Sequence, residues 1–193
     1  SFNQENVSDK QAKRLRHRRA VRGIAYDKDG NIAMIHAKNE GYYTLPGGGV
    51  KPEETFEQGI IRECKEEIGC DVQIIRYIGT TVEYRKNEGY MSESSGYILN
   101  VVGQKGSPIL VGDESDAEKN SVVEWTTIDD AIKAMESIPW PSDLYIQNII
   151  SRDIVFLKTA KEQPSNLVYS ERSSASLAAV VLLLSWTFLS SFK

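Results

Sequence analysis

The sequence predicts a mixed α/β layered domain, and three observations carry this prediction. Segments of strand character alternate with segments of helical periodicity over residues 18–161. The turn sequence at residues 27–30, Asp-Lys-Asp-Gly, joins two apolar segments as in a β-hairpin. A glycine loop at residues 47–49 runs into a helix that has clear start and stop signals. At 193 residues the chain can hold one such domain and an appendage.

The elements follow from local patterns in chain order. Residues 1–17 form a polar, basic arm. The hairpin strands come next, and a short strand beginning at Tyr42 leads into the glycine loop. Apolar periodicity and turn residues then predict the remaining elements: a helix at 56–68, strands at 71–85, 95–103 and 121–125, a helix at 128–135, and a last helix from 142 with Tyr145, Ile149, Ile150 and Phe156 as its buried stripe. Polar loops are expected at 87–93 and 112–120.

Charge and cysteine content exclude some functional classes. The net charge of −4 gives no reason to expect general binding to DNA. Six lysines and arginines nevertheless crowd into residues 10–19, either as a solvated lead-in to the first strand or as an arm that contacts phosphate or RNA. Arg22 in that strand could reach a phosphate or form a surface ion pair. Two cysteines, Cys64 and Cys70, fit buried apolar positions and a reducing, cytoplasmic compartment.

The C-terminal segment differs from the rest of the chain. A polar linker at residues 162–172 precedes an apolar tail at 173–193, in which only Lys193 is charged. Twenty helical residues would span a bilayer core, so the tail could tether the protein to a membrane. Its strongly apolar part is short, which equally fits a helix packed on the domain or an artefact at the end of the reading frame.

The predicted helix at 56–68 carries an unusual acidic face. Thr55 and Gln58 form a capping box, and Gly69 ends the helix. Its predicted core face comprises Ile60, Ile61, Cys64 and Ile68. Glu63, Glu66 and Glu67 share a neighbouring face, where like charges at this spacing repel each other.

A divalent cation would explain this clustering of carboxylates. Mg²⁺ and Mn²⁺ prefer carboxylate oxygens, and Mg²⁺ is commonly held by a few carboxylates together with substrate phosphates. The loop of Gly47, Gly48 and Gly49 would let the backbone approach those phosphates closely. The pattern therefore predicts phosphoryl chemistry, in which positioning and charge neutralisation dominate.

The full spacing around this helix resembles the Nudix box. Gly48, Glu54 and the run from Arg62 to Cys70 stand at its fixed positions, and the flanking strands are similar to those of Nudix domains over residues 18–161. The resemblance implies an α/β/α sandwich with a mixed central sheet. Cys64 and Cys70 stand where a larger aliphatic residue is usual.

What the family resemblance implies can be assigned residue by residue. Glu63, Glu66 and Glu67 would hold one or more Mg²⁺ or Mn²⁺ ions with the Gly47 carbonyl, and Glu63 would orient or deprotonate the attacking water. Glu54 and Arg62 would hold the glutamates in place. A further acid from a later loop would be Glu118, ahead of Glu114 and Asp116. The reaction would be hydrolysis of a diphosphate linkage in a small nucleotide substrate.

Subgroup signatures leave the substrate open. The proline typical of ADP-ribose enzymes is absent, since Arg85 stands near its place, and Asn87 and Glu88 occupy the region of the tyrosine that marks dinucleoside polyphosphate enzymes. A MutT-like nucleoside triphosphate pyrophosphohydrolase is the default by elimination. The alternative is a Nudix-fold module that binds a nucleotide or RNA without cleaving it. His36 is expected to be structural, and Tyr42 or Tyr43 would pack on the sheet or stack on a base.

Overall fold

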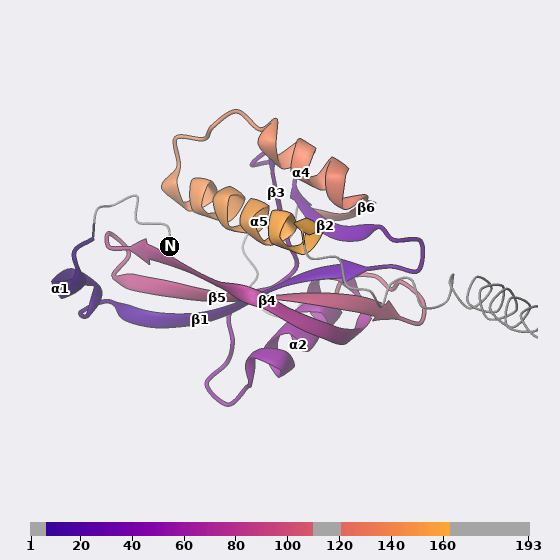
Figure 1. The fold of residues 1–193 in the computed structure, drawn as a ribbon, viewed down its shortest axis with the longest axis horizontal. Coiled ribbons are helices and arrows are strands. Elements are labelled where there is room, and N and C mark those ends of the chain that lie inside the picture. The colour runs from indigo at the N-terminus through magenta and orange to yellow at the C-terminus, as the bar shows by residue number, and fades with distance from the viewer. Residues whose placement is uncertain (1–6, 110–120, 163–193) are drawn as a thin grey trace, which may run out of the picture. The chain divides into compact units, whose positions relative to one another are not determined.

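A computed structural model describes residues 7–109 and 121–162, which form a six-stranded sheet with helices on both sides (Figure 1). The sheet order is β3-β2-β1-β5-β4, and β6 also pairs with β2. β1 and β5 run parallel, whereas the other pairs are antiparallel. The strands are β1 (Arg16–Tyr26), β2 (Ile32–Ala37), β3 (Tyr42–Thr44), β4 (Asp71–Arg85), β5 (Tyr90–Val102) and β6 (Ser121–Thr126). The helices are α1 (Asp9–Ala12), α2 (Phe56–Ile68), α4 (Ile128–Glu136) and α5 (Leu144–Glu162).

Each face of the sheet is covered by its own helical layer. α2 packs on one face over a cluster that includes Val21, Ile60 and Leu99, and α4 and α5 cover the opposite face over a cluster that includes Ile24 and Leu157 (Figure 1). Alternation of side chains along a strand explains why both faces are apolar near the middle of the sheet. The predicted α/β/α sandwich with a mixed central sheet is confirmed.

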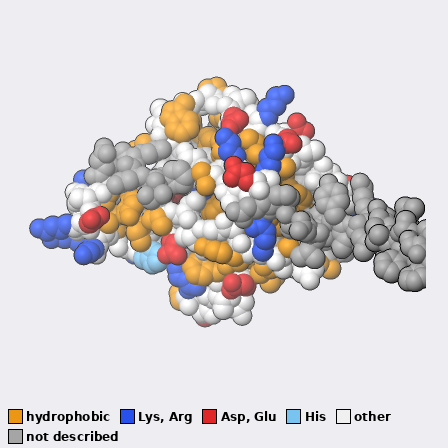
Figure 2. Space-filling view, in the orientation of Figure 1, with side chains coloured by type: hydrophobic (Ala, Val, Ile, Leu, Met, Phe, Trp, Pro, Cys, Tyr) orange, Lys and Arg blue, Asp and Glu red, His pale blue; other side chains and the backbone are white. Residues whose placement is uncertain are grey.

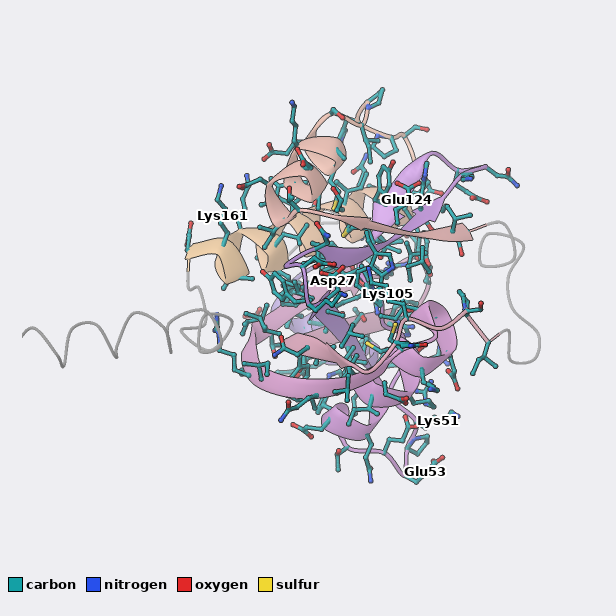
Figure 3. The ribbon with its side chains drawn as sticks, turned by 90° about the vertical axis from the view of Figure 1, so that its right-hand side faces the viewer. Asp27, Lys51, Glu53, Lys105, Glu124 and Lys161 are labelled. Carbon is teal, nitrogen blue, oxygen red and sulfur yellow. The ribbon has the colours of Figure 1, made fainter. Side chains whose placement is uncertain are left out.

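The hairpin turn is stabilised by one buried carboxylate. Asp27 accepts hydrogen bonds from the backbone N–H groups of Asp29 (2.9 Å) and Asn31 (2.8 Å). Its second oxygen accepts from Lys105 Nζ at 2.6 Å, so the turn is tied to the segment that follows β5 (Figure 3). Such side-chain bonds to the backbone favour a turn over continued strand.

α2 begins and ends where the sequence predicts. Thr55 accepts from the Gln58 backbone N–H at 3.1 Å, and the Gln58 side chain accepts from the Thr55 N–H at 2.9 Å. Gly69 ends the helix in the left-handed conformation, with φ of 66°. The predicted core face is wrong for Ile61, which is 43% exposed, because only a narrower stripe of the helix contacts the sheet. Cys64 and Cys70 are buried free thiols, as predicted.

Long-range pairing extends two strands beyond their predicted ends. β1 starts at Arg16, inside the basic arm, and β5 starts at Tyr90, inside the predicted polar loop. The two strands pair in parallel, starting with Arg16 opposite Tyr90. Each strand therefore provides hydrogen-bond partners for the backbone of the other, and the local sequence of either segment does not reveal this pairing. The prediction that Tyr145 belongs to the buried stripe of α5 is wrong, because this residue is 47% exposed.

Some sequence predictions fall outside the described residues. Glu118, Glu114 and Asp116 lie there, as do the apolar tail at 173–193 and most of the linker before it. Among the helices of residues 7–109 and 121–162, none is long and apolar enough to cross a membrane.

Candidate active site

The glycine loop lies along the edge of β1, and backbone hydrogen bonds hold it there. The N–H groups of Val21 and Gly23 donate to the carbonyls of Gly48 (2.9 Å) and Pro46 (2.8 Å). Gly47, between these two acceptors, has φ of 139°, and a Cβ at this position would lie 2.2 Å from the Val21 carbonyl oxygen. Only glycine fits such a close approach of two backbones.

The acidic face of α2 directly contacts this loop. The Gly47 N–H donates to Glu67 Oε2 at 2.6 Å. A Cβ on Gly48 would lie 2.5 Å from Glu63 Oε1, so the absence of a side chain there makes the space for that carboxylate. The loop and the glutamates are therefore one continuous surface formed by two segments of the chain.

Arg62 binds three carboxylates and one loop carbonyl at once. Its guanidinium donates to both oxygens of Glu54, at 2.6 and 3.0 Å. Its Nη1 donates to Glu63 Oε1 at 2.9 Å and to Glu66 Oε2 at 2.8 Å, and its Nη2 donates to the Gly49 carbonyl at 2.9 Å. A planar guanidinium with several fixed donors suits this role better than a lysine would. The arginine thus offsets the repulsion expected between the glutamates.

The carboxylates differ in their titration. Hydrogen bonds from Arg62 lower the pKa of Glu54 to about 2, which keeps Glu54 ionised. Burial raises the pKa of Glu63, and the charge of Glu66 adds to this, although Arg62 opposes both. Glu63 is only 9% exposed, so a cation bound beside it in addition to Arg62 would further favour its charged form.

The donor set fits a hard divalent cation. Three carboxylates flank a glycine loop, and the space that a Cβ on Gly48 would fill holds the Glu63 carboxylate. In the part of the chain that the structure describes, no three acidic, histidine or cysteine side chains already converge as ligands. Glu63 and Glu66 instead accept from Arg62, and Glu67 accepts from Gly47. The carboxylate oxygens suit Mg²⁺ or Mn²⁺ chemically.

A pocket of about 680 Å³ adjoins the site and is unusually rich in arginine. It lies beside Gly49 and Val50, and α5 supplies part of its wall. We name it the arginine pocket; its lining residues are Arg16, His17, Arg18, Arg19, Arg22, Gly49, Val50, Pro52, Arg85, Tyr90, Tyr145, Ile149 and Arg152. The expectation of a surface ion pair for Arg22 is wrong, since this residue is only 8% exposed.

A buried ion pair joins the arginine pocket to the strand before the glycine loop. Arg152 Nε donates to Asp153 Oδ1 at 2.7 Å, and both residues are almost completely buried. The other oxygen of Asp153 accepts from the Leu45 N–H (2.9 Å) and the Thr44 hydroxyl (2.8 Å). α5 is thereby tied to the segment that enters the loop.

The structure brings together the predicted site residues that it describes: Gly47, Gly48, Gly49, Glu54, Arg62, Glu63, Glu66 and Glu67. Sequence reasoning missed Arg85 and Arg152 as pocket residues. The sequence offered one indication for each residue, namely an arginine within a predicted strand (Arg85) or within an apolar helical segment (Arg152). His36 hydrogen-bonds Glu124 at 2.8 Å and stacks on Tyr43, a packing arrangement on the sheet. Glu124 is labelled in Figure 3.

Comparisons with known proteins give the family. The NUDIX domain family matches residues 16–146. The chain is 28% identical over 122 residues to a MutT-like protein of Streptomyces ambofaciens, covering 63% of this chain and 71% of the relative. It is 36% identical over 87 residues to an ADP-ribose pyrophosphatase of Methanocaldococcus jannaschii, covering 44% of this chain and 51% of that relative.

A solved structure agrees at the level of the fold. The MutT protein of Methanosarcina mazei superposes with a TM-score of 0.52 at 17% identity, covering 78% of this chain and 98% of that chain. The family match spans most of the residues that form the sheet, the glycine loop and the carboxylate cluster on α2. The chain belongs to the Nudix hydrolase family.

Proposed function

We propose that this protein hydrolyses the diphosphate linkage of a nucleoside diphosphate joined to another group, with Mg²⁺ or Mn²⁺ as its cofactor. The observation that carries the proposal is the network around Arg62, in which one guanidinium holds Glu54, Glu63 and Glu66 against the glycine loop. The named relatives include an ADP-ribose pyrophosphatase and an RNA pyrophosphohydrolase, which act on different substrates. A shared diphosphate chemistry fits this range.

The roles of the residues follow from their positions. Glu63 is buried and has a raised pKa, so it suits the task of orienting the attacking water and accepting its proton. Glu66 and Glu67 would hold the metal from the same helix face, with the Gly47 carbonyl as a further ligand. The metal, when bound, would neutralise charge on the diphosphate and lower the pKa of water. Arg62 and Glu54 position the other glutamates.

The glycine loop would bind the diphosphate. Gly48 and Gly49 have no side chains to keep phosphate oxygens from the backbone, and the loop is held on β1 by hydrogen bonds. A loop held in this way would position the phosphorus atom relative to Glu63. We take a MutT-like activity on nucleoside triphosphates as the default within this class, since one named relative is MutT-like.

The test is metal-dependent turnover by the full chain. Nucleoside triphosphates, ADP-ribose, a dinucleoside tetraphosphate and a 5′-triphosphate RNA would be incubated with Mg²⁺, with Mn²⁺ or with EDTA, and products resolved by chromatography. Glu66→Gln should reduce turnover at least 100-fold, because it removes a charged ligand. Glu53→Gln is the matched control, since Glu53 is exposed in the loop before α2 and is labelled in Figure 3.

A non-catalytic sensor is the second candidate, and the arginine pocket is the observation that favours it. A basic cavity can bind an anionic ligand without cleaving it. Absence of turnover on every substrate, with metal-dependent nucleotide binding by a folded protein, would support the sensor. Metal-dependent turnover that is lost in Glu66→Gln would exclude it.

A further inference from the structure

The arginine pocket offers hydrogen-bond donors almost exclusively. Six of its lining residues are arginines, and the other polar side chains are one histidine and two tyrosines. No aspartate, glutamate, asparagine or glutamine lines it among the residues that the structure describes. Arginine cannot accept a hydrogen bond, so a ligand that fills the pocket must be rich in acceptors and negatively charged.

Strand register explains how three of these arginines come to one face, whereas Arg19 alternates to the α2 side and lies over the Phe56 ring. Arg16, Arg18 and Arg22 alternate along β1, so their side chains share a face of the sheet. Arg22 lies opposite Gly96, where a Cβ would meet Phe156 of α5 at 2.6 Å. This row therefore faces the α5 layer, which supplies Tyr145, Ile149 and Arg152 to the same pocket.

Two serines of β5 add unused polar atoms to this face. Ser92 lies opposite Arg18, and Ser94 lies two residues further along the strand. Their hydroxyl groups are buried, and neither has a hydrogen-bond partner among the described residues. Buried polar atoms without partners are uncommon in proteins. Neither serine lines the arginine pocket, so they add only to the polar character of the sheet face beside it.

Positive charge in the pocket is only partly balanced. Arg152 pairs with Asp153, Arg85 pairs with Glu83 at 3.2 Å and with Glu88 at 3.4 Å, and His17 lies 2.8 Å from Glu93. Arg22 is 8% exposed, and its Nε has no hydrogen-bond partner within the described part of the chain. Burial, followed by the positive charge of Arg152, lowers the pKa of Arg22 to about 10. An anion bound between the two arginines would relieve this repulsion.

Resting on the proposed hydrolysis of a diphosphate, we propose that the arginine pocket binds further phosphate groups of the substrate. The substrate is then a small molecule whose diphosphate lies at the glycine loop and whose remaining part carries several phosphates. The two sites are contiguous, since Gly49 belongs to both the loop and the pocket wall. Arg22 also lies beside the loop, because a Cβ on Gly47 would lie 3.0 Å from the Arg22 Cα.

The same chemistry argues against recognition of a nucleobase in this pocket. Amino groups on a base edge need an acceptor, and the pocket offers few. The aromatic ring of Tyr145 is covered by Arg85, whose guanidinium carbon lies 4.4 Å from the ring centroid. The Arg85 guanidinium carbon also lies 5.5 Å from the Tyr90 ring centroid, so both tyrosines support an arginine.

Binding of inorganic tripolyphosphate to the metal-free full chain tests the proposal without relying on turnover. Titration calorimetry would compare tripolyphosphate with inorganic monophosphate for the wild type and for Arg18→Gln, Arg22→Gln and Arg14→Gln. Arg14 is the matched control, because it is exposed in the same basic stretch but does not line the pocket. Figure 2 shows basic side chains gathered at the end of the molecule that carries α1.

The expected result is tripolyphosphate binding at least ten-fold tighter than monophosphate binding. Arg18→Gln and Arg22→Gln should each weaken it about ten-fold, which is about 1.4 kcal/mol, and Arg14→Gln should change it less than two-fold. Arg22 is buried, so the fold of its variant is checked by circular dichroism. Arg18 is exposed, and its variant keeps the test valid if the Arg22 variant does not fold.

Three results would overturn the proposal. The first is equal affinity for tripolyphosphate and monophosphate. The second is a loss of tripolyphosphate affinity in Arg14→Gln as large as in Arg18→Gln. The third is competition by a 5′-triphosphate oligonucleotide that is much stronger than competition by tripolyphosphate, which would indicate an RNA site instead. Failure of the proposed hydrolysis is distinguishable, because it would abolish turnover and leave tripolyphosphate binding intact. If the protein hydrolyses a diphosphate and the arginine pocket binds further phosphates, kcat/KM for a substrate with extra phosphates should fall at least ten-fold in Arg18→Gln. The value of kcat/KM for ADP-ribose should change less.

Discussion

Replacement of Gly48 by alanine would test the geometry of the site with a single methyl group. The new Cβ would lie 2.5 Å from Glu63 Oε1 and 2.8 Å from Glu63 Cδ. Ordinary contacts at such atoms begin near 3.5 Å, so the carboxylate must retreat by about 1 Å. Gly48 does not have a positive φ, so alanine brings no backbone strain, and the effect falls on Glu63.

The expected loss of activity is much larger than the expected loss of stability. A displacement of about 1 Å at a catalytic group typically costs about 100-fold in rate. Weakening the bond from Arg62 to Glu63 costs about 1–2 kcal/mol, of which replacing glycine recovers about 0.5 kcal/mol through the unfolded state. The melting temperature should therefore fall by only about 2–4 °C.

The assay combines steady-state hydrolysis in Mg²⁺ with thermal unfolding, and Gly49→Ala serves as the comparison. A Cβ on Gly49 would meet nothing closer than Arg18 Nη2 at 3.6 Å, so Glu63 stays in place and kcat should fall at most a few-fold. The added methyl group lies in the proposed phosphate loop, so the larger effect of Gly49→Ala should be a raised KM. Equal kcat values for Gly48→Ala and the wild type would refute the proposed position of Glu63 in catalysis. An unfolded Gly48→Ala protein would refute the view that the carboxylate can move aside at small cost.

Other predictions concern charge. Glu63→Gln should lower kcat by about 100-fold or more, because it removes the proposed proton acceptor. The raised pKa of Glu63 means that stability falls as pH rises from 4.5 through its folded pKa, so in metal-free buffer at pH 7 this variant should be no less stable than the wild type in urea. Glu54 has a lowered pKa, about 2, so its stabilisation is present above pH 4.5 and lost as pH falls toward 2. Glu54→Gln should therefore lose about 1–2 kcal/mol at pH 7, and urea titrations at falling pH should show that difference shrink. Asp153→Asn leaves the buried Arg152 unpaired and should lower the free energy of unfolding by about 3 kcal/mol; a loss below 1 kcal/mol would contradict the described ion pair.

Local patterns predicted most elements because their signals are short-range. The capping box of Thr55 and Gln58 and the terminal Gly69 placed α2 at its observed ends. The hairpin turn was equally readable, since Asp27 bonds residues within its own turn. The starts of β1 and β5 could not be predicted from local sequence, because the first residues of each strand depend on the other strand for backbone hydrogen-bond partners.

The carboxylate cluster was readable from the sequence by itself, since its members lie on one helix at fixed spacing and the glycine loop precedes them directly. The periodicity of α2 places Glu63, Glu66 and Glu67 on one face whatever surrounds the helix. The sequence thereby determined the family, the fold class and the metal-binding character expected of the site. The structure adds the contacts by which Arg62 holds Glu54, Glu63 and Glu66 beside the glycine loop.

The arginine pocket depended on tertiary structure. Arg22, Arg85 and Arg152 lie on β1, β4 and α5, far apart along the chain, and each looks alone like a surface residue. Only the parallel pairing of β1 with β5, and the packing of α5 over that face, bring them together and bury them. Charge at a site is a sum over space, and local sequence spacing carries no information about residues that meet through a sheet and a distant helix.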